Sequence, residues 1–274
     1  MLIRHDLKLV FVHVPKCAGK ALREILTFNA PKGSIEVLWS YKYCNTLHRY
    51  VDLAHLPMSD LRCYKQFEYL DKYKVIACIR NPYSRLLSAV NEYYRQRNSI
   101  DEEKVKQGRI SKTMKQDYYD QLLDKHPQHD PRTIHSLPIH YFTHFATEPK
   151  VDYLIRCEDI KSEFLTVANK LKLPIEILQL AEIRLFNKSK PIDFSKLSKL
   201  EIELANLLYE VDFNTFEYRK KNINSCRYSN LLETDPSKIK QIHFSKKITW
   251  HWHDKPWGPA SAINDFPTKL EPSR

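Results

Sequence analysis

Residues 75–88 read Val75-Ile76-Ala77-Cys78-Ile79-Arg80-Asn81-Pro82-Tyr83-Ser84-Arg85-Leu86-Leu87-Ser88. The apolar run over 74–79 is typical of a buried strand. Asn81 is a favoured helix cap and Pro82 fits the first helical position, so the pattern predicts a strand that passes directly into a helix. A helix N-terminus attracts phosphate, and Arg80 places a cation at the strand exit.

A second junction of the same kind lies earlier in the chain and reads Phe11-Val12-His13-Val14-Pro15-Lys16-Cys17-Ala18-Gly19-Lys20. The pattern predicts a strand over 7–14 and a helix over 19–28, with lysines at the turn. One such junction is common among proteins. Two in one chain, each with a cation at the strand exit, indicate a ligand that carries two separate phosphate groups.

The remaining pattern continues the alternation of strands and helices. We expect helices over 58–69 (with Ser59 as its N-cap), 159–171 and 196–211, and a third strand over 151–157. This alternation predicts an α/β fold with a P-loop-like parallel sheet flanked by helices. We expect a single main domain over 1–220 with a helical insertion at 99–135, and a basic C-terminal extension over 221–274.

The composition narrows the class of partner. The chain has 274 residues, 42% hydrophobic and 12% aromatic, which are values of a globular protein, and its formal charge of +11 indicates an anionic partner. The six cysteines form no CxxC pair, so we expect no disulfide framework. No apolar stretch approaches the roughly 20 residues of a membrane span, and no signal peptide is recognisable. These features predict a cytoplasmic protein.

Two other functions fit part of the pattern. A P-loop kinase with magnesium would need GxxxxGK[ST], but Val14 stands at the first glycine and Ala21 replaces the hydroxyl residue. A non-enzymatic, basic nucleic-acid-binding protein fits the charge, but no recognisable nucleic-acid module accompanies it. The tail motif His251-Trp252-His253 lacks neighbouring ligands at metal spacing, and we interpret it as an ordinary packed or exposed segment.

The two junctions together resemble the PAPS-dependent sulfotransferase superfamily (PAPS is 3′-phosphoadenosine 5′-phosphosulfate), most closely its carbohydrate, family 2-like branch. The loop at 15–19 resembles the family's 5′-phosphosulfate loop, and 80–89 resembles its 3′-phosphate motif. Three later segments are similar to further family motifs, namely 153–160, Phe186-Asn187-Lys188-Ser189 and 209–218. The resemblance spans about residues 8–218 and implies transfer of a sulfuryl group from PAPS to an acceptor hydroxyl, with a carbohydrate as the expected acceptor.

The resemblance also implies roles for particular residues. Lys16 would be the catalytic cation that neutralises the departing phosphate, and Arg80 and Ser88 would hold the 3′-phosphate. The remaining donor-binding residues would be Pro15, Cys17, Ala18, Gly19, Lys20, Lys188 and Ser189. Family members usually carry Thr and Ser where this chain has Lys20 and Ala21. Either Lys20 replaces a hydroxyl contact with a charge-assisted one, or the difference weakens donor binding or abolishes activity.

The acceptor hydroxyl needs a general base, and histidine has a suitable pKa. His55 lies between the two motifs, where related glycan sulfotransferases place their base; His48 and the carboxylate of Glu92 are the alternatives. This chemistry demands no metal. We expect 99–135 and the tail to shape a cleft for an acidic glycan, and we expect no nucleic-acid partner and no membrane span. The oligomeric state is left open by the sequence.

Overall fold

The computed structural model describes residues 1–47, 49–96, 110–123, 131–185 and 197–222. Within these ranges the chain forms two compact units. The first comprises the described residues of 1–81 and 139–185, and the second those of 82–138 and 197–222. No helix in the described ranges is long and apolar enough to cross a membrane.

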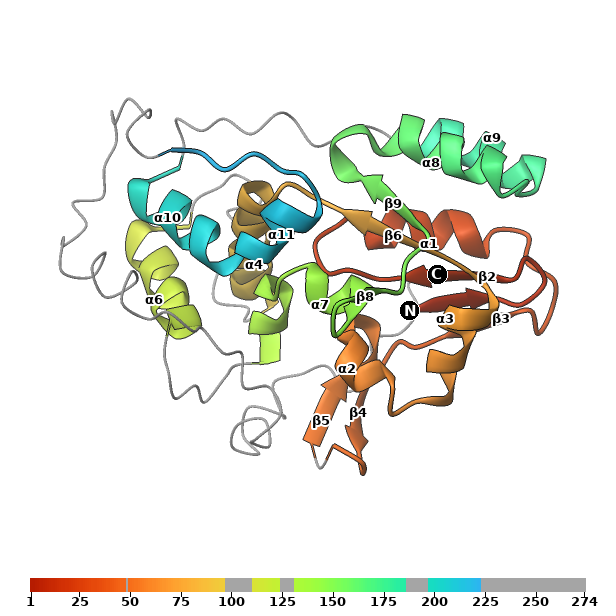
Figure 1. Cartoon of the computed structure of the whole chain (residues 1–274), viewed down its shortest axis with the longest axis horizontal. Coiled ribbons are helices and arrows are strands. Elements are labelled where there is room, and N and C mark those ends of the chain that lie inside the picture. The colour runs from red at the N-terminus through yellow and green to blue at the C-terminus, as the bar shows by residue number, and fades with distance from the viewer. Residues whose placement is uncertain (48, 97–109, 124–130, 186–196, 223–274) are drawn as a thin grey trace. The chain divides into compact units, whose positions relative to one another are not determined.

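The first unit is built on a mixed sheet of β1 (Leu2–Arg4), β2 (Leu9–Val12), β3 (Ile35–Val37), β6 (Lys74–Ile79) and β9 (Tyr153–Arg156) (Figure 1). Its order is β3-β1-β2-β6-β9. Strands β2, β6 and β9 run parallel, whereas β1 is antiparallel to both β2 and β3. The α/β prediction is confirmed, with the difference that the sheet is mixed because β1 forms a hairpin with β2.

Burial explains why these segments are strands. All of β2 is buried, and so are the five residues of β6 after Lys74, as expected for central strands covered on both faces. Because β2 and β6 are parallel neighbours, their carboxyl ends meet at one edge of the sheet. The chain leaves that edge as the 15–19 loop after β2 and as Arg80 after β6, so the topology brings the two predicted junctions together.

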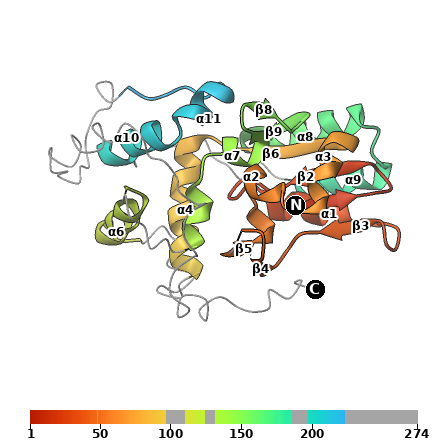
Figure 2. The ribbon, with the colours of Figure 1, turned by 60° about the horizontal axis from the view of Figure 1, so that its bottom comes forward.

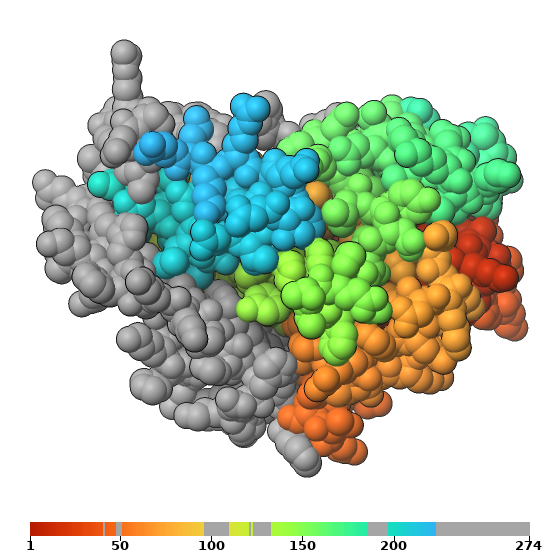
Figure 3. Space-filling model, in the orientation of Figure 1, coloured from red at the N-terminus to blue at the C-terminus, as the bar shows by residue number. Residues whose placement is uncertain are grey.

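Helices and small hairpins complete the first unit. Helix α9 (Ile175–Arg184) contacts both α1 (Gly19–Thr27) and α8 (Ile160–Lys170), and α8 and α9 lie side by side (Figure 2). The residues of α8 and α9 reach the surface in Figure 3. Strand β4 (Tyr41–Cys44) pairs with β5 (Arg49–Asp52), and α7 (His140–Thr143) is followed by β7 (His144–Phe145), which pairs with β8 (Glu148–Pro149).

The prediction of a single helix over 58–69 is wrong. The structure has α2 (Met58–Leu61), the 3-10 helix η2 (Lys65–Glu68) and α3 (Tyr69–Lys72). Pro57, not Ser59, occupies the cap position of α2. The break falls at Tyr64, which has an extended backbone at φ −115° and contacts Cys44 of β4. A side-chain contact distant in sequence therefore overrides the local helical pattern.

The second unit is a helical bundle of α4 (Pro82–Gln96), α6 (Lys112–Leu123), η3 (Pro131–Ser136), α10 (Lys199–Leu208) and α11 (Glu210–Thr215). Its buried cluster contains Tyr83, Tyr93, Tyr118, Tyr119 and Leu204, among others. The predicted helix over 196–211 is therefore two helices, which meet at the buried Tyr209. Tyr118 and Tyr119 bury one face of α6, which lies in the segment expected to be an insertion.

Candidate functional site

The 15–19 loop has an unusual backbone. Lys16 and Ala18 have φ angles of 63° and 55°, the left-handed region that residues other than glycine rarely adopt. Ala18 occupies the cap position of α1 without a side-chain hydrogen bond, and the first turn of α1 contains no acidic residue. The positive end of the α1 dipole is therefore not neutralised by its own first turn, as an anion site requires.

Arg80 meets this loop from the neighbouring strand. Its Nη1 donates a hydrogen bond to the backbone oxygen of Lys16 over 3.3 Å. Its Nε is buried and has no hydrogen-bond partner among the described residues. A guanidinium N–H without a partner is costly when buried, so an additional acceptor at this position is favourable. The structure thus brings the predicted residues Lys16 and Arg80 together.

Three buried cysteines pack beneath the loop. The thiol of Cys157, which directly follows β9, contacts the thiols of Cys17 in the loop and of Cys78 in β6. The contact with Cys17 lowers the pKa of Cys157, but the contact with Cys78 and burial raise it by more, so that the pKa lies well above its usual value. The thiol of Cys157 therefore stays protonated, and the three cysteines act as small core side chains that support the loop.

His55 is held by a carboxylate and by a second imidazole. Its Nδ1 lies 2.6 Å from Oδ2 of Asp52, and the side chain of His55 is 14% exposed. The ring of His13 lies 4.7 Å from that of His55, centroid to centroid, at an angle of 50°. His13 also lies close to Gly19, the last residue of the 15–19 loop, so His55 is connected to that loop through His13.

His13 is in turn fixed by a stack of rings. It lies parallel to the indole of Trp39 at a centroid distance of 5.6 Å and an angle of 4°. The guanidinium of Arg23 lies 3.6 Å from the centroid of the Trp39 ring. Trp39 is therefore in contact with two other side chains, and these contacts join the end of β2, α1 and the β3–β4 connection.

The junction between β6 and α4 has its own anchor. The backbone N–H of Asn81 donates to Oε1 of Glu158 over 2.7 Å. A second carboxylate, that of Glu163, accepts from the backbone N–H of Arg156. Glu158 lies in the segment that resembles the family's late Arg-x-Glu motif, and its geometry gives that segment a structural role, because it ties β9 to the exit of β6.

The other predicted site residues do not take part in the contacts described above. Lys20 is exposed at the start of α1 and Ser88 lies half-buried on α4, in the second unit. Glu92, an alternative base, forms an ion pair with Arg95 on the same helix. The other candidates lie outside the described residues, and these are Lys188, Ser189, the alternative base His48 and the tail motif 251–253.

Sequence reasoning missed Asp52, His13 and Glu158 as parts of this site. Asp52 had a usable signal, because a carboxylate close to a histidine often accepts a hydrogen bond from its Nδ1 and so orients the ring. His13 and Glu158 act through contacts between different elements, which a single sequence does not reveal. In the described ranges, no three His, Cys, Asp or Glu side chains are grouped to hold a metal ion.

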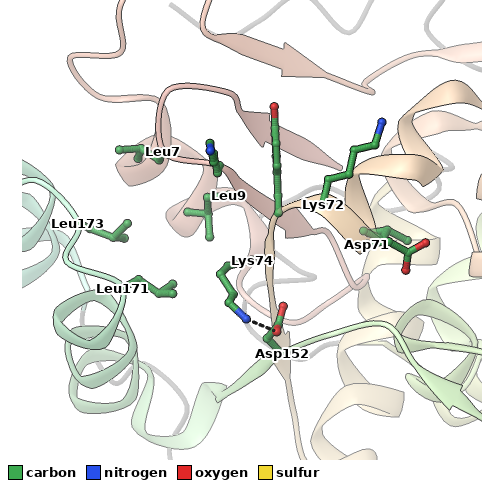
Figure 4. Close-up of a pocket in the computed structure, with 11 residues that line it drawn as sticks. Leu7, Leu9, Asp71, Lys72, Lys74, Asp152, Leu171 and Leu173 are labelled. Atoms are coloured by element: carbon green, nitrogen blue, oxygen red, sulfur yellow. Dashed lines mark hydrogen bonds and ion pairs between the residues drawn. The ribbon is translucent and has the colours of Figure 1, made fainter.

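A hollow of about 330 Å³ lies at the other end of the sheet (Figure 4). Leucines line one side, and charged residues of α3 and β6 line the other. Lys74 there is paired with Asp152 at 3.0 Å. Lys74 is the first residue of β6, whereas Arg80 follows its last, so the hollow is separated from the 15–19 loop by the length of the strand.

The fold brings a loop with a left-handed backbone, a helix N-terminus and the side chain of Arg80 together at one edge of the parallel strands. The model of the Sulfotransferase family matches residues 1–219. No significant match was found among curated proteins or among solved structures. The chain belongs to the sulfotransferase family and is an enzyme that transfers a sulfuryl group.

Proposed function

We propose that this sulfotransferase moves the sulfuryl group of PAPS to a hydroxyl group of a carbohydrate. The observation that carries the proposal is the meeting of Arg80 with the 15–19 loop, where Nη1 of Arg80 binds the Lys16 carbonyl and the buried Nε has no partner among the described residues. A doubly phosphorylated nucleotide offers acceptors for both junctions. A ligand with one phosphate group would use only one of them.

The loop residues have separate roles in this proposal. The backbone of Pro15, Cys17, Ala18 and Gly19 shapes the turn at the α1 N-terminus, and Lys16 neutralises the charge that develops on the departing phosphate. Lys20 adds a second cation where relatives use a hydroxyl. The transfer requires alignment and charge stabilisation more than covalent help, so no metal is invoked.

Recognition of the 3′-phosphate is assigned to Arg80, with Ser88 on α4 as its partner. By resemblance, Lys188 and Ser189 close over the nucleotide. The orphaned Nε of Arg80 supports the first assignment, because a phosphate oxygen would satisfy it with a charge-assisted hydrogen bond. The contribution of Ser88 is expected to be smaller, since a neutral hydroxyl donates a weaker bond.

His55 is proposed as the general base that takes the proton of the acceptor hydroxyl. Its hydrogen bond to Asp52 supports this role, because catalytic histidines are commonly oriented by a carboxylate. An acidic glycan is the proposed acceptor, since the formal charge of +11 favours a polyanion. The segment 99–135 and the tail after 220 are proposed to shape its cleft. Cytoplasmic location remains a prediction from the sequence.

Calorimetric titration with 3′-phosphoadenosine 5′-phosphate tests the donor assignment, and 5′-AMP, which lacks the 3′-phosphate, is the matched ligand. The parent protein should prefer the first ligand. Arg80→Ala should lose about 10- to 150-fold in affinity for it, the equivalent of a charged hydrogen bond of roughly 1.5–3 kcal/mol, and should bind 5′-AMP almost as the parent does. Ser88→Ala should lose about 5-fold.

Lys74→Ala is the control variant, because it removes one positive charge at the opposite end of β6. Its affinity should match that of the parent. Absence of binding at millimolar nucleotide, or equal affinity for the two ligands, would contradict the proposal. Magnesium-dependent binding of ATP would favour a kinase instead, and salt-dependent binding of DNA or RNA without nucleotide binding would favour a nucleic-acid-binding protein.

A further inference from the structure

Asp52 uses both of its carboxylate oxygens to hold one turn. It is the last residue of β5 and caps η1 (Leu53–His55), where its Oδ1 accepts a hydrogen bond from the backbone N–H of Ala54 over 2.9 Å. Its Oδ2 lies 2.6 Å from Nδ1 of His55. The turn is itself tied to the start of β4, because the N–H of Leu53 donates to the carbonyl of Ser40, the residue before that strand, over 2.8 Å. The carboxylate therefore has a fixed direction.

We infer that Asp52 is a positioning residue, which sets the tautomer and the orientation of His55 for sulfuryl transfer. An ionised carboxylate only accepts hydrogen bonds, so Nδ1 of His55 must carry the proton. The lone pair of the neutral ring then lies on Nε2, at the opposite edge of the imidazole. The inference rests on the proposed role of His55 as the base, and it identifies which nitrogen acts.

The surrounding rings restrict the alternative orientation of His55. Turning the imidazole over would break the bond to Asp52, and the ring would have to rotate past His13, whose centroid lies 4.7 Å away. His13 cannot easily yield, because it is stacked on Trp39. The two neighbours therefore have complementary effects: Asp52 selects the nitrogen that is protonated, and His13 limits the rotation of the ring.

The same bond stabilises the charged state of the base during the reaction. The acceptor O–H bond breaks as its proton passes to Nε2, the acceptor oxygen bonds to sulfur, and the bond from sulfur to the donor phosphate breaks with its electron pair leaving on that phosphate. His55 then carries a positive charge with both nitrogens protonated. Asp52 faces that charge through a charge-assisted hydrogen bond.

Asp52→Asn is the sharpest test, because it separates the two roles of the carboxylate. The amide oxygen of asparagine can still accept from the Ala54 N–H and preserve the turn. Its NH₂ group would then face Nδ1 of His55, which must become an acceptor and move the ring proton to Nε2. We expect turnover with PAPS and an acidic glycan to fall by about 100-fold or more, with unchanged affinity for 3′-phosphoadenosine 5′-phosphate.

The tautomer is read directly from the ring ¹⁵N shifts of histidine-labelled protein, with His55 assigned by the signal that disappears in His55→Gln. The parent should show a protonated Nδ1, and Asp52→Asn a protonated Nε2. Asp52→Glu, which restores a carboxylate, should recover the parental tautomer and part of the turnover. Asp52→Ala should lose turnover together with thermal stability, because it also removes the cap.

Three results would overturn the inference. These are an unchanged tautomer in Asp52→Asn, a switched tautomer with parental turnover, and parental turnover in His55→Gln. The spectroscopic reading needs neither donor nor acceptor, so it stays informative even if the parent fails to bind 3′-phosphoadenosine 5′-phosphate. That failure would contradict the proposed donor site, whereas a wrong tautomer would contradict only the role of Asp52.

Discussion

The imidazole of His13 fills the space that a side chain at position 19 would need. An ideal Cβ built on Gly19 would lie 1.9 Å from Cδ2 and 2.0 Å from Nε2 of His13. His13 is stacked on Trp39 and touches His55, so it has little room to retreat. The φ angle of Gly19 is not in the left-handed region, so its backbone conformation does not require glycine. The close approach of the His13 ring does. The absence of a side chain at Gly19 thus leaves room for the ring of His13.

We expect Gly19→Ala to destabilise the protein by about 1–3 kcal/mol, the usual cost of overpacking. The displaced His13 should also disturb the 15–19 loop and weaken nucleotide binding. Urea unfolding gives the first quantity and calorimetry the second. In a His13→Ala background the same change should be neutral or stabilising, since alanine is otherwise favoured over glycine in a helix by about 0.5–1 kcal/mol. Equal costs in both backgrounds would contradict the steric explanation.

Ala18 provides a test of backbone strain in the loop. Its φ of 55° costs an L-residue about 1–2 kcal/mol, and glycine avoids this cost but loses more entropy on folding. We expect Ala18→Gly to raise the free energy of unfolding by roughly 0.5–1 kcal/mol. Ala21→Gly, inside α1, is the control and should lower it by about 1 kcal/mol. A loss of stability in both variants would show that the left-handed backbone at position 18 is not strained.

Glu158 should matter for stability through its oxygen rather than through its charge. Glu158→Ala leaves the Asn81 N–H without its acceptor, at an expected cost of about 1–3 kcal/mol. Glu158→Gln keeps Oε1 as a carbonyl acceptor and should lose much less. Denaturation curves of the two variants against the parent measure the difference. If glutamine were as costly as alanine, the negative charge would be the important property.

The stacked histidines of the first unit predict a loss of stability in mild acid. Burial, and after it the neighbouring His144, lower the pKa of His140 to about 4. An unfolded histidine titrates near 6.5, so below that pH the unfolded chain gains a proton that the folded chain does not accept. Stability is therefore complete above pH 6.5 and declines as the pH falls toward 4. Denaturation curves measured across this window should show that His140→Gln gains stability relative to the parent, with a constant difference above pH 7.

The central strands and the two strand-to-helix junctions could be predicted because their signals are local. The apolar run at 74–79 coincides with β6, and Pro82 begins α4 as expected. Central strands that are buried on both faces give continuous apolar runs, which are the clearest pattern in a sequence. The meeting of Lys16 with Arg80 then follows from the parallel topology, since both residues leave the same edge of the sheet.

The surroundings of His55 could not be predicted in the same way. The β4–β5 hairpin lies in a stretch that reads as irregular, and its local pattern does not predict it. The stack of Arg23, Trp39 and His13 joins residues of three separate elements, and such contacts are set by tertiary packing rather than by local propensity. The prediction of one helix at 58–69 is wrong for the same reason, because the side chain of Tyr64 contacts Cys44 of another element.

The pairing of β4 with β5 has a consequence for how the enzyme would lose activity. The proposed nucleotide loop is anchored in the central strands, whereas Asp52 and His55 follow a two-stranded ribbon, a kind of element that is only marginally stable by itself. Local opening of that ribbon requires less free energy than opening of β2 and β6. Amide protons of β5 should exchange with solvent before those of β6, and gentle warming should abolish turnover while the protein still retains its nucleotide.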